Sequence, residues 1–379
     1  MTLKKSLKSR IRGWLPEEPQ LHRNVSSTKL RPQIAVLLTV SLVVASSVGG
    51  YLVYRELLPV VPNPQASSRV TQDIYIFPEG VSPASASNLL SKNGDVYTFT
   101  ENISDPVYVD SNNTVLNGAG YSLLGFRVQV DGGQNNVTVE NLKVYQGGID
   151  LQGSNYDTVC GNYIVGDVGV LVRGSYNSVT NNSIVSTSDG GNTGQKLPLS
   201  GGDSLNCGIE MDALPVFDQQ HATNYNNVTG NQVCNFQNGI LLWNASENFV
   251  ANNYFANNAE GITLQQGTGN TFVGNTVQGS LYAVTPNQAS NNTFFGNSFV
   301  DNKNQIVDAQ TYSSIKVQAS VNIWDNGTIG NYWSNYHELY PKAQEISSSG
   351  VEDTPYQIYA NNTDQYPLSA ASGNMGADG

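Results

Sequence analysis

A repeat of about 22 residues runs through the middle of this 379-residue chain. An apolar residue, followed three places later by Asn, recurs at a constant step of 22 at Val228, Val250, Phe272 and Phe294. The same register continues backwards through Val179, Val159, Val139 and Val115, with steps of 20, 20 and 24. Self-similarity at a fixed period of this size indicates a stacked repeat architecture. The fold must therefore place these residues in one column.

Each repeat adds further columns with the two-residue alternation of a β-strand. The second apolar column is Val144, Ile164, Ile184, Val233, Phe255, Val277 and Phe299. The third is Ile149, Val170, Ile209, Ile240, Ile262, Val284 and Ile306. A polar column consists of Asn162, Asn182, Asn231, Asn253, Asn275 and Asn297, and Asn favours turns. This pattern predicts an all-β, single-stranded parallel β-helix, whereas the alternative, a β-propeller, has a period of about 40 to 50 residues.

The N-terminal region has the pattern of a membrane anchor. An uncharged stretch of 21 residues, 34–54, lies between Arg31 and Arg55 and is long enough to span a bilayer as a helix. The excess of Lys and Arg in the preceding tail, 1–33, predicts that the tail is cytoplasmic and that the rest is extracellular or periplasmic. The alternative is a signal peptide that is cleaved near residue 47.

The remaining segments follow from composition and repeats. Residues 55–70 are rich in Pro and predict a stalk, and residues 71–368 predict the β-helix domain. Within that domain we expect a cap over 71–114, regular turns over 115–310 and an aromatic C-terminal cap over 311–368, followed by a disordered tail over 369–379. The first strands are expected near Tyr97.

Charge and modification motifs limit the partners. Beyond residue 31 the chain has 10 basic and 28 acidic residues, so it would repel nucleic acid and we exclude that partner. The three cysteines cannot all pair within one chain. Nine Asn-x-Ser/Thr sequons follow the predicted membrane span and are candidate glycosylation sites, although several coincide with turns of the repeat. They are Asn102, Asn112, Asn136, Asn181, Asn227, Asn244, Asn291, Asn326 and Asn361.

The repeats, together with an opening and a closing motif, resemble NosD-type β-helix proteins over roughly residues 90–368. The motifs that carry the resemblance are Tyr97-Thr-Phe-Thr100, Asn117-Gly-Ala-Gly-Tyr121, Gly330-Asn-Tyr-Trp-Ser-Asn-Tyr336, Asp353-Thr-Pro-Tyr356 and Asn361-Asn-Thr-Asp-Gln-Tyr-Pro-Leu368. The resemblance implies a right-handed coil and a periplasmic copper-handling accessory role. Relatives often carry an Asp/Gly-rich run after the Asn-Tyr-Trp-Ser element. This chain has 337–352 there instead, so we expect no acidic calcium loop.

One irregular turn is the strongest candidate for a functional site. The step from Val179 to Val228 is 49 residues, which indicates two insertions that flank a single strand, residues 209–212. If Ile209 and Met211 point inward, Glu210 and Asp212 point outward, roughly 6.5 to 7 Å apart, a separation that suits inverting glycoside hydrolysis. The same outward columns contain candidate ligand-binding residues, namely Asp150, Gln152, Arg173, Trp243 and Gln265.

The irregular turn also contains residue types that bind soft metals. Cys207, His221 and Cys234 lie in or beside it, as does Met211, and copper favours such ligands. Met211 is expected in the core, so these residues are weak candidates for a metal site.

Three functions remain open at this point. The first is a membrane-anchored surface protein that binds glycan or cell-wall material through the face around residues 209–212. The second is a polysaccharide hydrolase or lyase that uses Glu210 and Asp212. The third is the copper handling that the resemblance implies. The outward residues could also be solvated without any function.

Overall fold

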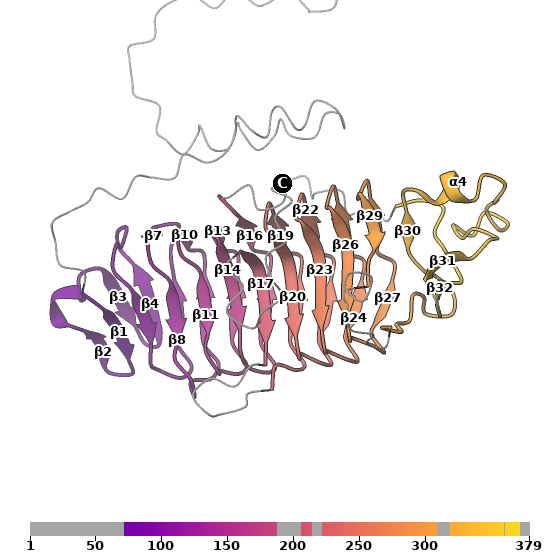
Figure 1. Cartoon of the computed structure of the whole chain (residues 1–379). Coiled ribbons are helices and arrows are strands. Elements are labelled where there is room, and N and C mark those ends of the chain that lie inside the picture. The colour runs from indigo at the N-terminus through magenta and orange to yellow at the C-terminus, as the bar shows by residue number, and fades with distance from the viewer. Residues whose placement is uncertain (1–71, 188–205, 214–221, 309–318, 360, 372–379) are drawn as a thin grey trace, which may run out of the picture. The chain divides into compact units, whose positions relative to one another are not determined.

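The computed structural model describes residues 72–187, 206–213, 222–308, 319–359 and 361–371. The predicted basic tail, membrane span and stalk lie outside these residues, as do His221 and most of the two insertions. No helix within the described ranges is long and apolar enough to cross a membrane. The described part of the chain is an all-β solenoid (Figure 1).

Three long sheets, called here A, B and C, form the walls of the solenoid. Sheet A stacks β2 (Gly80–Ser82), β1 (Ile74–Phe77), β5 (Val107–Val109), β8 (Val128–Val130), β11 (Ile149–Leu151), β14 (Val168–Val172), β17 (Cys207–Asp212), β20 (Asn238–Trp243), β23 (Glu260–Gln265), β26 (Tyr282–Asn287) and β29 (Asn304–Ile306).

Sheets B and C complete each turn. Sheet B stacks β3 (Leu90–Asn93), β4 (Val96–Phe99), β6 (Val115–Asn117), β9 (Thr138–Glu140), β12 (Thr158–Cys160), β15 (Ser178–Thr180), β18 (Asn227–Thr229), β21 (Phe249–Ala251), β24 (Thr271–Val273) and β27 (Thr293–Phe295). Sheet C stacks β7 (Ser122–Leu124), β10 (Lys143–Tyr145), β13 (Tyr163–Val165), β16 (Ser183–Val185), β19 (Gln232–Cys234), β22 (Tyr254–Ala256), β25 (Thr276–Gln278), β28 (Ser298–Val300) and β30 (Tyr332–Trp333). The chain passes from B to C to A in each turn, so like strands of successive turns pair in parallel.

The apolar columns fill the interior. Val228, Val250, Phe272 and Phe294 pair in register along sheet B, and all four are fully buried. The rings of Phe272 and Phe294 stack with centroids 4.6 Å apart. The parallel β-helix that the 22-residue period predicts is therefore confirmed. Its register is wrong at the first predicted member, because Leu116 rather than Val115 pairs with Val139 and is buried.

Two ladders of buried asparagines bind successive turns together. In the predicted ladder, each backbone N–H of the Asn column donates to the side-chain oxygen of the next Asn, as Asn231 N does to Asn253 Oδ1 at 2.9 Å. A second ladder was not predicted from the sequence, although it has a constant step of 22 residues from Asn226 to Asn292. It runs through Asp157, Asn177, Asn226, Asn248, Asn270, Asn292, Asn322 and Asn362.

Irregular elements close both ends of the described solenoid. At the N-terminal end lie two antiparallel pairs, β1 with β2 and β3 with β4, and a 3-10 turn, η1 (Ala84–Ala86). Because β1 already pairs in parallel with β5, the sheets begin at Ile74, earlier than the expected Tyr97. At the C-terminal end lie α4 (Tyr336–Leu339) and the hairpin of β31 (Tyr356–Tyr359) and β32 (Asn362–Asp364).

The closing motif completes the core and the ladders. Trp324 stacks on Phe294 and Trp333 on Phe299, with centroids 4.5 and 4.7 Å apart. The indole nitrogen of Trp324 donates to Asn362 Oδ1, the terminal acceptor of the second ladder, at 2.9 Å. The indole nitrogen of Trp333 donates to Asp364 Oδ2, the terminal acceptor of the first ladder, also at 2.9 Å. The closing motif, which is one of the motifs that carry the resemblance, is thus a structural cap.

Candidate functional site

Sheet A contains the longest strands of the described solenoid. The strands β17, β20, β23 and β26 have six residues each, whereas their counterparts in sheets B and C have three. Longer strands present more side chains per turn on one flat wall. Ile209 and Met211 of β17 are buried in the core, so Glu210 and Asp212 lie on the outer face, as expected from strand alternation.

The pairing register sets the neighbours of these two carboxylates. Glu210 is opposite Leu171 of β14 on one side and Leu241 of β20 on the other. Asp212 is opposite Trp243 of β20, which in turn is opposite Gln265 of β23. The columns that the sequence places on this face therefore run along it.

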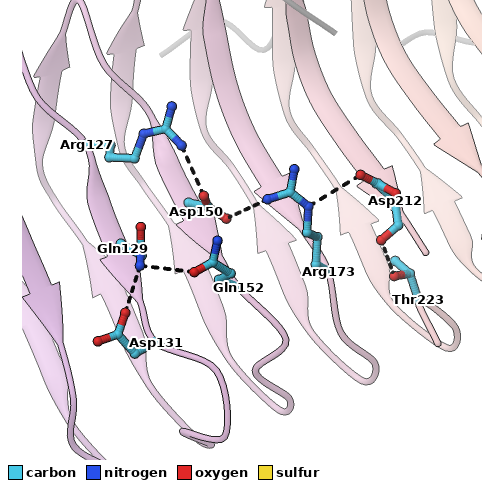
Figure 2. Close-up of polar contacts among 8 residues, drawn as sticks. All are labelled: Arg127, Gln129, Asp131, Asp150, Gln152, Arg173, Asp212 and Thr223. Carbon is cyan, nitrogen blue, oxygen red and sulfur yellow. Dashed lines mark hydrogen bonds and ion pairs between the residues drawn. The ribbon is translucent and has the colours of Figure 1, made fainter. Parts of the chain in front are cut away.

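Four residues of the outer face form an alternating chain of charges (Figure 2). Arg127 Nη1 contacts Asp150 Oδ2 at 3.1 Å, and Arg173 Nη1 lies 3.8 Å from Asp150 Oδ1. Arg173 Nε then contacts Asp212 Oδ2 at 3.3 Å. Arg173 consequently bridges two carboxylates that belong to different turns, 62 positions apart in the sequence.

Further polar contacts lie beside the charge chain (Figure 2). Gln129 Nε2 donates to Asp131 Oδ1 at 2.8 Å and to Gln152 Oε1 at 3.1 Å. Thr223 Oγ1 donates to the backbone carbonyl of Asp212 at 2.7 Å. The predicted residues Asp150, Gln152, Arg173 and Asp212 are thereby brought into one region.

Burial separates the outer-face residues into two groups. Glu210 and Asp212 are only 2% and 1% exposed, and Asp150, Arg173 and Thr263 are also buried. The expectation that outward residues here are simply solvated is wrong for this group. Trp243, Gln265 and Asn287, which share one column, are partly exposed, as is Gln152. The Trp243 column is therefore accessible to a ligand, whereas Asp150, Arg173 and Asp212 of the charge chain are buried.

A polar cluster around the Glu260 carboxyl lies on the same face and was not predicted from the sequence. Thr263 Oγ1 lies 2.9 Å from Asn238 Oδ1 and 2.9 Å from Glu260 Oε2. Burial raises the pKa of Glu260 above its ordinary value. A protonated Glu260 can donate to the Thr263 hydroxyl, which can then donate to Asn238. The signal that could have found this cluster was that Asn238 and Glu260 occupy the same repeat position, 22 residues apart.

The metal candidates that the structure describes lie on different elements. Cys207 begins β17 in sheet A, Cys234 ends β19 in sheet C, and Met211 is fully buried in the core. Burial, with a contribution from Glu210, raises the pKa of the Cys207 thiol well above its ordinary value, which disfavours the thiolate that binds metals. In the described ranges no group of three or more His, Cys, Asp or Glu side chains could hold a metal ion. The described residues therefore do not fit a copper site.

Part of this chain is similar to a known family. A family model described as "Periplasmic copper-binding protein (NosD)" matches residues 217–338, which are 122 of the 379 residues. The resemblance to NosD-type proteins is therefore supported over this part of the β-helix. The NosD match begins after Asp212 and includes Trp243, Gln265 and Cys234, so the charge chain lies outside it. The search of curated proteins found no significant match.

The chain is also distantly similar to several solved structures. A mutant of the periplasmic alginate epimerase AlgG has 13% identity and a TM-score of 0.36, over 68% of this chain and 79% of that one. A tailspike protein of E. coli bacteriophage HK620, solved with a hexasaccharide, has 12% identity and a TM-score of 0.37, over 61% and 48%. The A-module of the Azotobacter vinelandii mannuronan C-5 epimerase AlgE6 has 10% identity and a TM-score of 0.25, over 67% and 88%.

Proposed function

We propose that this protein is a membrane-anchored surface protein that binds a glycan of the extracellular or periplasmic space along the outer face of sheet A. The observation that carries the proposal is the column of Trp243, Gln265 and Asn287, which are partly exposed and aligned on successive turns. A ligand site of this kind needs an apolar surface and a few convergent polar groups. An indole and two amides meet that need for a sugar ring and its hydroxyls.

The charges of this face favour an uncharged glycan over a uronic acid polymer. Arg127 and Arg173, the two arginines of the face, are both already paired with Asp side chains. An anionic sugar would have to displace those pairs, and the chain beyond residue 31 has an excess of 18 acidic residues. We therefore propose a neutral hexose or amino-sugar polymer as the ligand class.

Binding is better supported than catalysis by Glu210 and Asp212. Both carboxylates are buried, and Asp212 already contacts the Arg173 guanidinium. A general acid and a general base must reach the substrate within hydrogen-bond distance. The hydrolase or lyase proposal would gain support if reducing ends were released and if that activity disappeared in Asp212→Asn.

The first test compares two aromatic variants of the full-length chain on a glycan array. We expect Trp243→Ala to lose at least about ten-fold in affinity for a glycan that the wild-type protein binds, because a hot-spot aromatic residue contributes about 2 kcal/mol or more. Phe249→Ala is the matched control, since Phe249 is an exposed aromatic residue of the next turn, on sheet B. Equal binding by Trp243→Ala and wild type would reject the site.

The same preparation separates the other functions. Reducing-sugar release would favour an enzyme, and stoichiometric copper in the purified protein would favour the role in the family description. The anchor has its own test, since an intact N-terminus in the membrane fraction supports an uncleaved span. A mature N-terminus near residue 47 would contradict it.

A further inference from the structure

The asparagines of the two ladders and the asparagines of the sequons differ in exposure. Every Asn of the two ladders is buried. All nine asparagines of the Asn-x-Ser/Thr sequons lie within the described residues, and all nine are exposed. No ladder Asn is the first residue of a sequon, which is the residue that would accept the glycan.

Strand alternation explains why the two sets do not overlap. A ladder Asn is followed two positions later by a core residue, as Asn253 is by Phe255 and Asn275 by Val277. A Ser or Thr at that position would put a hydroxyl in the core, so a ladder Asn cannot begin a sequon at low cost. In a sequon such as Asn291-Asn-Thr293, the ladder residue is the middle one, Asn292, and the outer two residues face outward.

Three sequons have the geometry most open to a modifying enzyme. Asn181, Asn244 and Asn291 occupy corners between sheets, with left-handed φ values of 54°, 50° and 61° that Asn tolerates. Their sequon hydroxyls, on Ser183, Ser246 and Thr293, are partly exposed. Asn136 differs, because its Nδ2 donates to Asn113 Oδ1 at 2.9 Å.

We propose that the outward sequon asparagines are acceptors for N-linked glycans, with Asn181, Asn244 and Asn291 the most completely modified. In this reaction the side-chain Nδ2 forms a bond to the anomeric carbon of an activated glycosyl phosphate donor. The bond between that carbon and the phosphate oxygen breaks, the phosphate leaves with the electron pair, and one amide proton is released. The ladder asparagines are excluded because their Nδ2 atoms are buried and hydrogen-bonded to the backbone, as Asn275 Nδ2 is to Val250 O at 2.8 Å.

At Asn181, Asn244 and Asn291 the modification would place carbohydrate at corners between sheets rather than on a sheet wall. Asn244 directly follows Trp243, so a glycan at Asn244 would stand at the border of the outer face of sheet A. Asn181 lies between β15 and β16, at the corner of sheets B and C, away from that face. The proposal does not depend on glycan binding by Trp243, and its test has a different readout.

The test is glycopeptide mass spectrometry on the full-length protein purified from its own organism. We expect the peptides that contain Asn181, Asn244 and Asn291 to carry added carbohydrate mass, and peptides with ladder asparagines to carry none. In Ser183→Ala, Ser246→Ala and Thr293→Ala the Asn remains but the hydroxyl is lost, so the glycan should disappear from the corresponding peptide. Thr293→Ser keeps the hydroxyl and should stay modified.

Two results would overturn the proposal. One is unmodified mass at all three asparagines in the protein from its own organism. The other is carbohydrate that persists in Thr293→Ala, which would mean that the sequon is not what directs the attachment. Circular dichroism of each variant, with the β-sheet signal of the wild type, confirms that a lost glycan does not reflect a lost fold.

Discussion

At the scale of single residues, Arg173 is the most constrained side chain of the outer face. It is buried, and its guanidinium lies between Asp150 and Asp212. Replacing one partner of a buried ion pair leaves an uncompensated charge in a poorly solvated site. Here a single replacement would remove an ion pair from two buried carboxylates, Asp150 and Asp212.

The first prediction at this scale compares two arginines that share Asp150. Arg173→Ala should destabilise the protein by about 3 kcal/mol or more, because it removes the buried guanidinium that lies between Asp150 and Asp212. Arg127→Ala should cost less than about 1 kcal/mol, because the Arg127 side chain is half exposed and its ion pair is screened by water. Urea-induced unfolding followed by circular dichroism measures both. A cost for Arg173→Ala no larger than that for Arg127→Ala would show that the charge chain does not hold the turns together.

At the scale of elements, each turn is joined to the next by the sheets and by the Asn ladders. Asn253 illustrates the ladder. Its side chain accepts from Asn231 N and Asn231 Nδ2, at 2.9 and 3.0 Å, and donates to Val228 O and Asn275 Oδ1, both at 2.9 Å. One amide thus contacts turns on both sides.

Removing that amide should weaken the solenoid more than removing an exposed one. Asn253→Ala should cost about 3 kcal/mol, since four hydrogen bonds are lost at roughly 1 kcal/mol each and buried backbone groups lose partners. Asn227→Ala, in an exposed position at the start of β18, should change stability by less than about 0.5 kcal/mol. Equilibrium unfolding of unglycosylated protein makes the comparison. Similar costs for the two variants would mean that the ladder is replaceable by water.

The sequence predicts elements of this kind well and the site less well, for a physical reason. Stacked turns repeat one chemical environment every 22 residues, so the period alone assigns Val250 and Asn253 to the core and to a ladder. The outer face has no such repetition. Its key contact joins Arg173 to Asp212 across an insertion, and no local pattern encodes that pairing. The burial of Glu210 was likewise not predictable from alternation, which distinguishes only the inner from the outer face.

At the scale of the whole molecule, an aspartate stands at one end of each ladder. Asp157 begins the second ladder, where its Oδ1 accepts from Val137 N, and Asp364 ends the first, where its Oδ2 accepts from Asn331 N and the Trp333 indole. Burial raises the pKa of Asp157 and of Asp364 to about 6. Each end of the ladder system therefore contains a carboxyl group whose protonated form is favoured by the folded state.

These two pKa values set the direction of the pH dependence of folding. An unfolded Asp titrates near pH 4, so between about pH 4 and pH 6 the folded state binds more protons than the unfolded state. The contribution of Asp157 and Asp364 to stability is therefore greatest below pH 4, falls as pH rises to about 6 and is constant above it.

Asp157→Asn continues the ladder with the amide found at Asn177 and Asn226, without a charge. We expect this variant to be more stable than wild type by about 1 to 3 kcal/mol at pH 7.5 and equal to it near pH 3.5. Thermal unfolding at both pH values tests this, and a variant that is less stable at pH 7.5 would show that the first position of the ladder requires the carboxylate.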